Sequence, residues 1–347
     1  MGKGGKTNRA SPPFPSIGID PDERRAAIAE ALIAGEPADA VIAALAADGM
    51  SPAAARYEVE KAEKSPYLRA GRRAAERLAK RDWTLAIYRR LAATDPAQAT
   101  ITVVDRIDPA RFYADFYHAN RPVKLTGLIS DWPALERWTL DGLEARLGHV
   151  PITLQDRRES SDRYELDKDA HLNRVPLADI IARLRAGASN DFYVTAYNDG
   201  ANKRVLAPLW EDVQPISLLA PTGGLDGFFW MGPKGTITPF HHDLTNNLLL
   251  QISGTKRVKM VAAHDGPMMR NSLHCFSDWR GEELPAGPGD PARPTVLECD
   301  IGPGEALFLP VGWWHHVEGL DVTIGMSFTN FAADNDFYSD YRTYGPL

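Results

Sequence analysis

The sequence predicts a mainly β domain, residues 100–347, behind a helical N-terminal module, residues 19–99. Three observations lead to this prediction. Helix start and stop signals recur through the first hundred residues, and short apolar strands separated by Gly/Pro turns follow them. In the strand-rich part, histidines and an aspartate recur in an order that suits a metal ion. Residues 1–18 contain three prolines and no periodicity, so we expect a mobile tail there.

Length, composition and charge limit the classes of protein to which the chain can belong. A chain of 347 residues allows one large and one smaller domain, and a net charge of −7 argues against a general nucleic-acid binder. Cys275 and Cys299 have no metal or redox spacing, so we expect free thiols in a reducing compartment. With neither a long apolar segment nor a signal-peptide core, the sequence predicts a cytoplasmic protein without a membrane partner.

The module is predicted to contain four helices. Asp20-Pro21 begins the first and Gly35 ends it, and the second covers residues 37–48. The third begins at Ser51-Pro52, and the fourth runs from Ser65-Pro66 to about residue 93.

The fourth helix is strongly basic. It contains eight basic residues and only two acidic ones, Glu76 and Asp82. The basic residues are Arg69, Arg72, Arg73, Arg77, Lys80, Arg81, Arg89 and Arg90. Such a run is usually a solvated face. The alternative is a docking surface for an acidic protein, a peptide or RNA, and the sequence leaves the choice open.

The first part of the β domain mixes strands and helices. We expect strands at residues 101–104, 150–154, 191–197 and 227–231, and helices at residues 109–118, 140–147 and 177–184. Trp132 and Trp138 are expected to be packing anchors. Residues 156–169 are crowded with charge, which predicts either a solvated loop or a lid at the entrance of a site.

The densest chemical signal is the run Thr238-Pro239-Phe240-His241-His242-Asp243. Side chains alternate along a strand, so His241 and Asp243 point to the same side and form a two-ligand clamp. His315 or His316 would add a third ligand, and two histidines with one carboxylate are the donor set of non-haem Fe(II) oxygenases. Periodicity does not select between these two histidines, and His-x-Asp alone often arises by chance.

The clamp is followed by an apolar run, residues 248–252, a turn at residues 253–256 and a second strand, residues 257–262. This pattern predicts a hairpin with the clamp at its entrance. The closing strands are expected at residues 295–299, 306–309, 316–318 and 322–328.

Two stretches carry a family resemblance: TPFHHDLTNNLLLQISGTKRVKMV, residues 238–261, and GPGEALFLPVGWWHHVE, residues 302–318. They resemble the cupin-like, Jumonji-C class of Fe(II)- and 2-oxoglutarate-dependent oxygenases, and are similar to the asparaginyl hydroxylase that inhibits hypoxia-inducible factor. The resemblance covers roughly residues 101–332. It implies a double-stranded β-helix (jelly-roll, cupin-like) that uses Fe(II), 2-oxoglutarate and dioxygen.

The resemblance also implies roles for individual residues. It selects His315 as the third metal ligand beside His241 and Asp243, and leaves His316 to packing. It assigns the co-substrate to Lys256, which pairs with its distal carboxylate, and to Thr238, Tyr193, Asn247 and Asn330. Tyr197 shares the face of Tyr193 and is the alternative to it. Each of these residues also has an ordinary structural role as its alternative, such as packing or satisfying buried backbone groups.

The implied activity is hydroxylation of a protein or peptide side chain, with succinate and carbon dioxide as the other products. A hydroxylase of RNA or of a small molecule with the same fold, and a non-catalytic cupin-fold binding module, are the alternatives. Ala332 stands where the asparaginyl hydroxylase has an aromatic residue, so that enzyme's substrate preference does not transfer. The sequence does not predict the oligomeric state.

Overall fold

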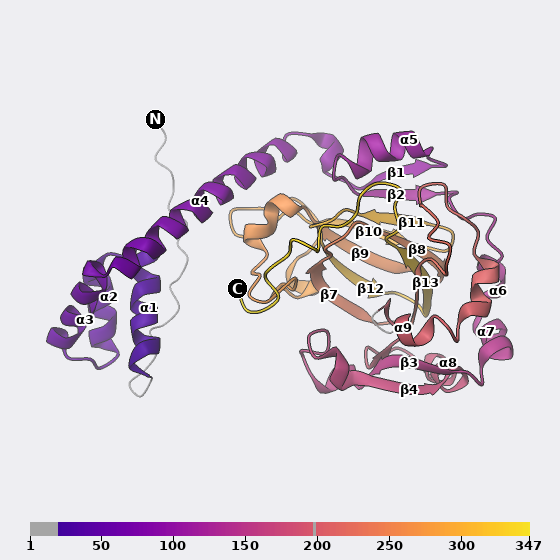
Figure 1. The fold of residues 1–347 in the computed structure, drawn as a ribbon, viewed down its shortest axis with the longest axis horizontal. Helices are drawn as coiled ribbons and strands as arrows, with labels where there is room; N and C mark the ends of the chain where they lie inside the picture. Colours follow the sequence, from indigo (N-terminus) through magenta and orange to yellow (C-terminus); the bar gives the residue numbers. More distant parts are fainter. Residues whose placement is uncertain (1–19, 197–198) are drawn as a thin grey trace. The chain divides into compact units, whose positions relative to one another are not determined.

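The structure is a computed structural model that describes residues 20–196 and 199–347 (Figure 1). The expected tail, residues 1–18, and Tyr197 lie outside these ranges. Contacts divide the chain into two units, one up to Tyr88 and one from Arg89 onward. The division falls inside the fourth helix, earlier than the boundary expected after residue 99.

The first unit has the four helices that its start and stop signals predict. They are α1 (Pro21–Ile33), α2 (Ala38–Ala47), α3 (Pro52–Lys64) and α4 (Pro66–Ala92). The Asp20 carboxylate accepts from the backbone of Asp22, and the Ser51 hydroxyl accepts from that of Ala54, which caps α1 and α3. A small apolar core holds the helices together; it contains Ile28, Leu32, Val41, Leu45, Ala55, Val59 and Leu68.

The basic residues of α4 between Arg69 and Arg81 are exposed, as a solvated face requires. A docking role for them stays a prediction. None of the helices in the two described ranges combines the length and the apolar character needed to cross a lipid bilayer.

The described residues of the second unit form three sheets. The largest has the strand order β1-β2-β11-β8-β13-β6, the second β10-β9-β12-β7, and the smallest β4-β3-β5. The strands are β1 (Thr102–Asp105), β2 (Val123–Thr126), β3 (Pro151–Asp156), β4 (Leu172–Pro176), β5 (Phe192–Tyr193), β6 (Phe228–Gly232), β7 (Ile237–His242), β8 (Asn247–Ser253), β9 (Lys256–Val261), β10 (Leu297–Ile301), β11 (Ala306–Leu309), β12 (Trp314–Gly319) and β13 (Thr323–Phe328). The two larger sheets form the predicted double-stranded β-helix.

The predicted hairpin of β8 and β9 is wrong. β8 pairs with β11 and β13, whereas β9 pairs with β10 and β12, so the turn between them carries the chain from one sheet to the other. Gly254 in that turn has a φ of +71°, a conformation that disfavours residues with a Cβ atom. Because both faces of β8 are buried, its apolar run is continuous, and continuous runs give no information on the pairing partner.

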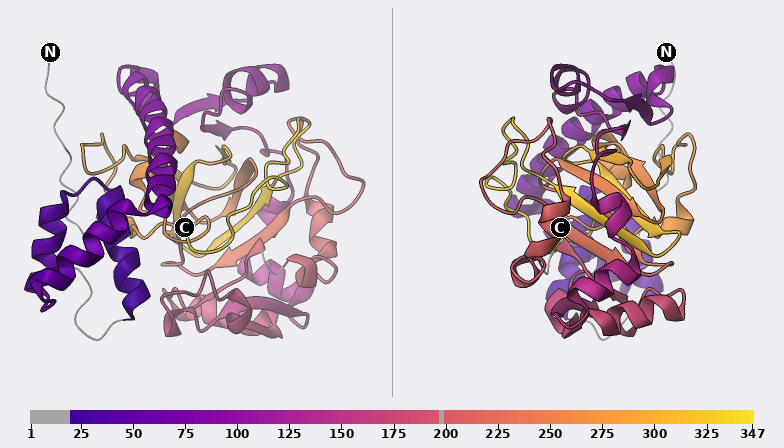
Figure 2. Two further views of the ribbon diagram at one scale, coloured as in Figure 1. Left: turned by 60° about the vertical axis from the view of Figure 1, so that its left-hand side comes forward. Right: turned by 90° about the vertical axis from the view of Figure 1, so that its right-hand side faces the viewer.

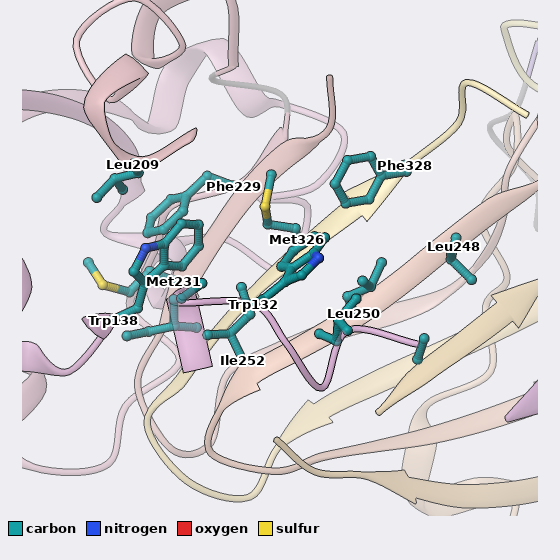
Figure 3. Close-up of a cluster of buried hydrophobic side chains, with 14 of the residues drawn as sticks. Trp132, Trp138, Leu209, Phe229, Met231, Leu248, Leu250, Ile252, Met326 and Phe328 are labelled. Carbon is teal, nitrogen blue, oxygen red and sulfur yellow. The ribbon is translucent and has the colours of Figure 1, made fainter. Parts of the chain in front are cut away.

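The described part of this unit also contains short helices. They are α5 (Pro109–Phe112), α6 (Ala134–Arg137), α7 (Leu140–Leu147), α8 (Leu177–Ala186) and α9 (Asp199–Asn202). Trp132 and Trp138 are packing anchors, as predicted: their rings lie 6.2 Å from Phe328 and 5.5 Å from Phe229, respectively (Figure 3). Figure 2 shows α8 with β3 and β4 as a layer beside the strands of the β-helix.

Candidate functional site

Strand β7 is the edge of the four-stranded sheet and carries the predicted clamp. It pairs with β12, and His241 lies opposite His315. Thr238 lies opposite Val317, so Pro239 and Phe240 together oppose one residue of β12 and form a β-bulge. Pro239 has no N–H to donate, which an edge strand with a bulge tolerates.

The bulge brings three predicted ligands together. The ligand atoms of His241, Asp243 and His315 all lie within 4.8 Å of one another, and no other such group occurs in residues 20–196 and 199–347. Nε2 of His241 is 3.7 Å from Asp243 Oδ1, and Nε2 of His315 is 3.9 Å from Asp243 Oδ2. His316 points elsewhere and packs its ring 5.3 Å from that of Phe240, as predicted.

Hydrogen bonds orient both histidines for a metal ion. Nδ1 of His241 donates to the carbonyl of Pro239 (2.9 Å), and Nδ1 of His315 donates to that of Trp313 (3.1 Å). Each Nδ1 therefore carries a proton, since a carbonyl only accepts, and each ring turns its Nε2 toward Asp243.

The protonation states also suit a metal ion. Burial lowers the pKa of His315 to about 4, so its imidazole is neutral at pH 7. Burial opposes ionisation of Asp243, but the two histidines and a hydrogen bond from Asn247 hold its pKa below the ordinary value. Neutral imidazoles and a carboxylate are the forms that bind a divalent cation.

Two adjoining cavities meet at the triad, an inner one of about 80 Å³ and an outer one of about 350 Å³. Both are lined by Trp230, Thr238, His241, Asp243, Asn247 and Ser327. The inner cavity adds Tyr193, Lys256 and His315, whereas the outer one adds Glu165, Lys168 and Phe276. A small ligand in the inner cavity and a larger one in the outer cavity would both reach the triad.

Lys256, the first residue of β9, lies in the inner cavity with only 3% of its surface exposed. Its Nζ donates to the Tyr193 hydroxyl at 3.3 Å, and in the described part of the chain no acidic side chain pairs with it. Burial lowers its pKa to about 8. A buried ammonium without a counter-ion costs several kcal/mol, so this cavity suits a ligand that brings a carboxylate.

Comparison with known proteins agrees with this geometry. Residues 109–336 match a family described as the cupin-like domain. The chain belongs to this family. Similar proteins include "Lysine-specific demethylase JMJ30" of Arabidopsis thaliana, 28% identical over 232 residues, which are 62% of this chain and 51% of that protein.

Two further relatives carry related names. "Bifunctional peptidase and (3S)-lysyl hydroxylase JMJD7" of Homo sapiens is 25% identical over 256 residues, 63% of this chain and 80% of that protein. "Bifunctional arginine demethylase and lysyl-hydroxylase psr-1" of Caenorhabditis briggsae is 28% identical over 297 residues, 73% of this chain and 67% of that protein. The chain spans about half the length of JMJ30 and of the lysine-specific demethylase 8 proteins that it also matches.

The other predicted co-substrate residues of the cupin-like domain differ in their placement. Thr238, Tyr193 and Asn247 line the inner cavity. Asn247 donates its amide to Asp243 Oδ2 (3.2 Å), and its buried Oδ1 has no partner among residues 20–196 and 199–347, so the amide keeps hydrogen-bonding capacity inside the cavity. Burial raises the pKa of the Tyr193 hydroxyl, which therefore stays protonated and able to donate.

Asn330 is not brought to the site. β13 ends at Phe328, and the Asn330 amide donates to the carbonyl of Ala220 (2.8 Å) beside a separate cavity of about 290 Å³. Ser327 lies in the wall of both cavities instead, and its hydroxyl accepts from Trp230 Nε1 (2.8 Å). Sequence reasoning missed both Ser327 and Trp230; a polar residue within the apolar run of β13 was the available signal.

The charged segment, residues 156–169, is in part a wall of the cupin-like domain's cavity. Arg158 is fully buried, and Glu165 lines the outer cavity with Lys168. Arg158 was not among the predicted site residues, because a charge run gives no sign that one of its arginines is buried. Both cysteines, Cys275 and Cys299, are free thiols, as predicted.

Proposed function

We propose that this cupin-like protein is an Fe(II)- and 2-oxoglutarate-dependent dioxygenase that hydroxylates a protein or peptide side chain. The observation that carries the proposal is the buried ammonium of Lys256, which has no acidic partner among the residues that the structure describes and lies in a cavity that also contains the triad. A ligand that binds the metal at one end and presents a carboxylate at the other would bind to the triad and also neutralise Lys256. The hydroxylase and demethylase names of JMJD7, psr-1 and JMJ30 support a protein substrate.

The donor set fits the metal. His241, Asp243 and His315 would hold Fe(II) through two imidazoles and one carboxylate, the set typical of iron oxygenases. When bound, the iron supplies the oxidising chemistry: 2-oxoglutarate, dioxygen and a substrate C–H bond become succinate, carbon dioxide and a hydroxylated product.

The chain's own residues bind and orient the reactants. Lys256 and Tyr193 bind the distal carboxylate of 2-oxoglutarate, while Thr238 and Asn247 line the path to the triad. The outer cavity receives the substrate side chain between Glu165, Phe276 and Trp230.

The test is turnover with product identification. Wild-type protein with Fe(II) and 2-oxoglutarate, incubated with a peptide digest of its host's proteins, is expected to release succinate and to add one oxygen atom to specific peptides. Asp243→Ala is expected to do neither. If oxygen is added to RNA or to a metabolite and no peptide is modified, the protein is instead a hydroxylase of RNA or of a small molecule.

A further inference from the structure

Strand β7, which carries His241 and is directly followed by Asp243, depends on support from outside its sheet. β7 is an edge strand whose pairing with β12 is interrupted by the bulge, so its outer edge needs other partners. At one end the backbone of residues 240–242 pairs with Cys275 and Ser277. At the other end the Ile237 N–H donates to Asn190 Oδ1 (2.8 Å), and the Ile237 carbonyl accepts from Arg158 Nη2 (2.7 Å).

Arg158 joins this edge to the rest of the site. The side chain is fully buried, and its Nη1 donates to the same Asn190 Oδ1 (3.0 Å) that holds Ile237. Its Nη2 also donates to Glu165 Oε1 (3.0 Å) in the wall of the outer cavity. The guanidinium carbon lies 5.3 Å from the ring centre of Tyr193, the partner of Lys256.

We propose that Arg158 is a positioning residue that fixes the metal-bearing strand, the co-substrate tyrosine and the substrate wall relative to one another. The inference deepens the proposed function and rests on it. A planar guanidinium satisfies several acceptors in one fixed geometry, whereas a lysine ammonium does not. Support of this kind behind metal ligands is typically worth about 10–100-fold in metal affinity or activity.

The same small sheet offers a matched control. Arg183 lies over the ring of Phe192 (4.0 Å), the neighbour of Tyr193 on β5, and its Nη2 donates to Asp156 Oδ1 (2.7 Å). Phe192 and Tyr193 point to opposite faces of their strand, and Arg183 lines neither of the two cavities at the triad. Arg158 lines neither cavity itself, but it contacts Tyr193 in the wall of the inner cavity and Glu165 in the wall of the outer one. The contacts of Arg183, Phe192 and Asp156, line neither cavity.

The experiment compares Arg158→Met, Arg158→Lys and Arg183→Met in the full chain. Dissociation constants for Co(II) and for 2-oxoglutarate are measured without oxygen by visible absorption, together with thermal unfolding. Both Arg158 variants are expected to bind 2-oxoglutarate or metal about 10–100-fold more weakly and to shift the absorption bands. Arg183→Met is expected to keep the wild-type constants and spectrum even if its unfolding temperature falls.

Two results would overturn the inference: a folded Arg158→Met with wild-type constants and spectrum, or an equal loss in Arg183→Met. If Arg158→Met does not fold, Asn190→Ala is measured in the same way, because it removes the acceptor shared by Arg158 and Ile237. Wild-type protein that binds neither Co(II) nor 2-oxoglutarate would refute the proposed function itself. If the wild-type protein binds Co(II) and 2-oxoglutarate and the Arg158 variants bind them equally well, only the role of Arg158 is refuted.

Discussion

Lys256 and Tyr193 meet inside the inner cavity, with the ammonium nitrogen 3.3 Å from the phenol oxygen. The partner of the buried cation is a neutral hydroxyl, so within the described ranges of the chain no acidic group compensates its positive charge. The pair thus provides one charge and one hydrogen-bond donor for the same carboxylate group.

Replacement of the cation is expected to weaken co-substrate binding and leave the metal site intact. Lys256→Met is expected to weaken 2-oxoglutarate binding by about two orders of magnitude or more, since breaking a buried charge pair costs about 3–5 kcal/mol. Equilibrium titration without oxygen measures this. Lys259→Met is the control, because Lys259 donates to the carbonyls of Gly281 and Leu284. Equal 2-oxoglutarate affinity in the two variants would contradict the assigned role.

The affinity for 2-oxoglutarate is expected to depend on pH through the same residue. Burial lowers the pKa of Lys256 to about 8 in the free protein, and the carboxylate binds the protonated form. Affinity is therefore constant below that pKa and falls as the pH rises through it, by up to about tenfold per pH unit. Titrations from neutral to alkaline pH test this, and a flat profile in metal-loaded protein would argue against a titrating lysine at the site.

Substitutions of the adjacent residues His315 and His316 are expected to have different effects, the first on metal binding and the second on packing. His315→Ala should lose Co(II) binding, because it removes one of three ligands. His316→Ala should keep Co(II) binding but lose about 2–4 kcal/mol of unfolding free energy, since its buried ring packs against Phe240. Metal titration and urea unfolding of both variants measure the two effects, and an exchange of the two phenotypes would reverse the assignment.

A buried carboxylate away from the site is expected to be structural. Asp212 is fully buried and accepts from Trp138 Nε1 (3.0 Å), from Arg137 (2.8 Å) and from Arg146. Asp212→Ala should destabilise the fold by about 1–3 kcal/mol, because it leaves the buried Trp138 N–H without an acceptor and removes the partner of two arginines.

Chemical unfolding checks this, with Asp141→Ala as an exposed control expected within about 0.5 kcal/mol of wild type. Burial opposes ionisation of Asp212, but Arg146, Arg137 and Trp138 hold its pKa below the usual value. The contribution of Asp212 to folding stability is therefore present above the pKa of this carboxyl in the unfolded chain. It is lost as the pH falls through the pKa of the carboxyl in the folded protein. A stable, wild-type-like Asp212→Ala would show that the cluster contributes little.

The sequence predicted what depends on local chemistry. Capping residues such as Asp20 and Ser51 define helix ends, and the alternation of side chains along a strand places His241 and Asp243 on one side. The choice of His315 over His316 needed the family resemblance, because both are buried and adjacent.

Features set by tertiary pairing were not predictable in this way. The assignment of β8 and β9 to different sheets depends on long-range partners that a continuous apolar run does not specify. Asn330 matched the family by spacing, but the end of β13 at Phe328 leaves Ser327, not Asn330, facing the cavity. Arg158 lies in a segment that reads as solvated, and only the fold shows that its guanidinium is enclosed.

The most direct test of the central claim is anaerobic addition of Fe(II) and then 2-oxoglutarate to the purified protein, followed by visible absorption. The account predicts a weak charge-transfer band that appears only when both are present. It also predicts that His241→Ala and Lys256→Ala lose the band. A folded, metal-loaded wild-type protein that shows no band would contradict the oxygenase assignment and favour a non-catalytic binding module.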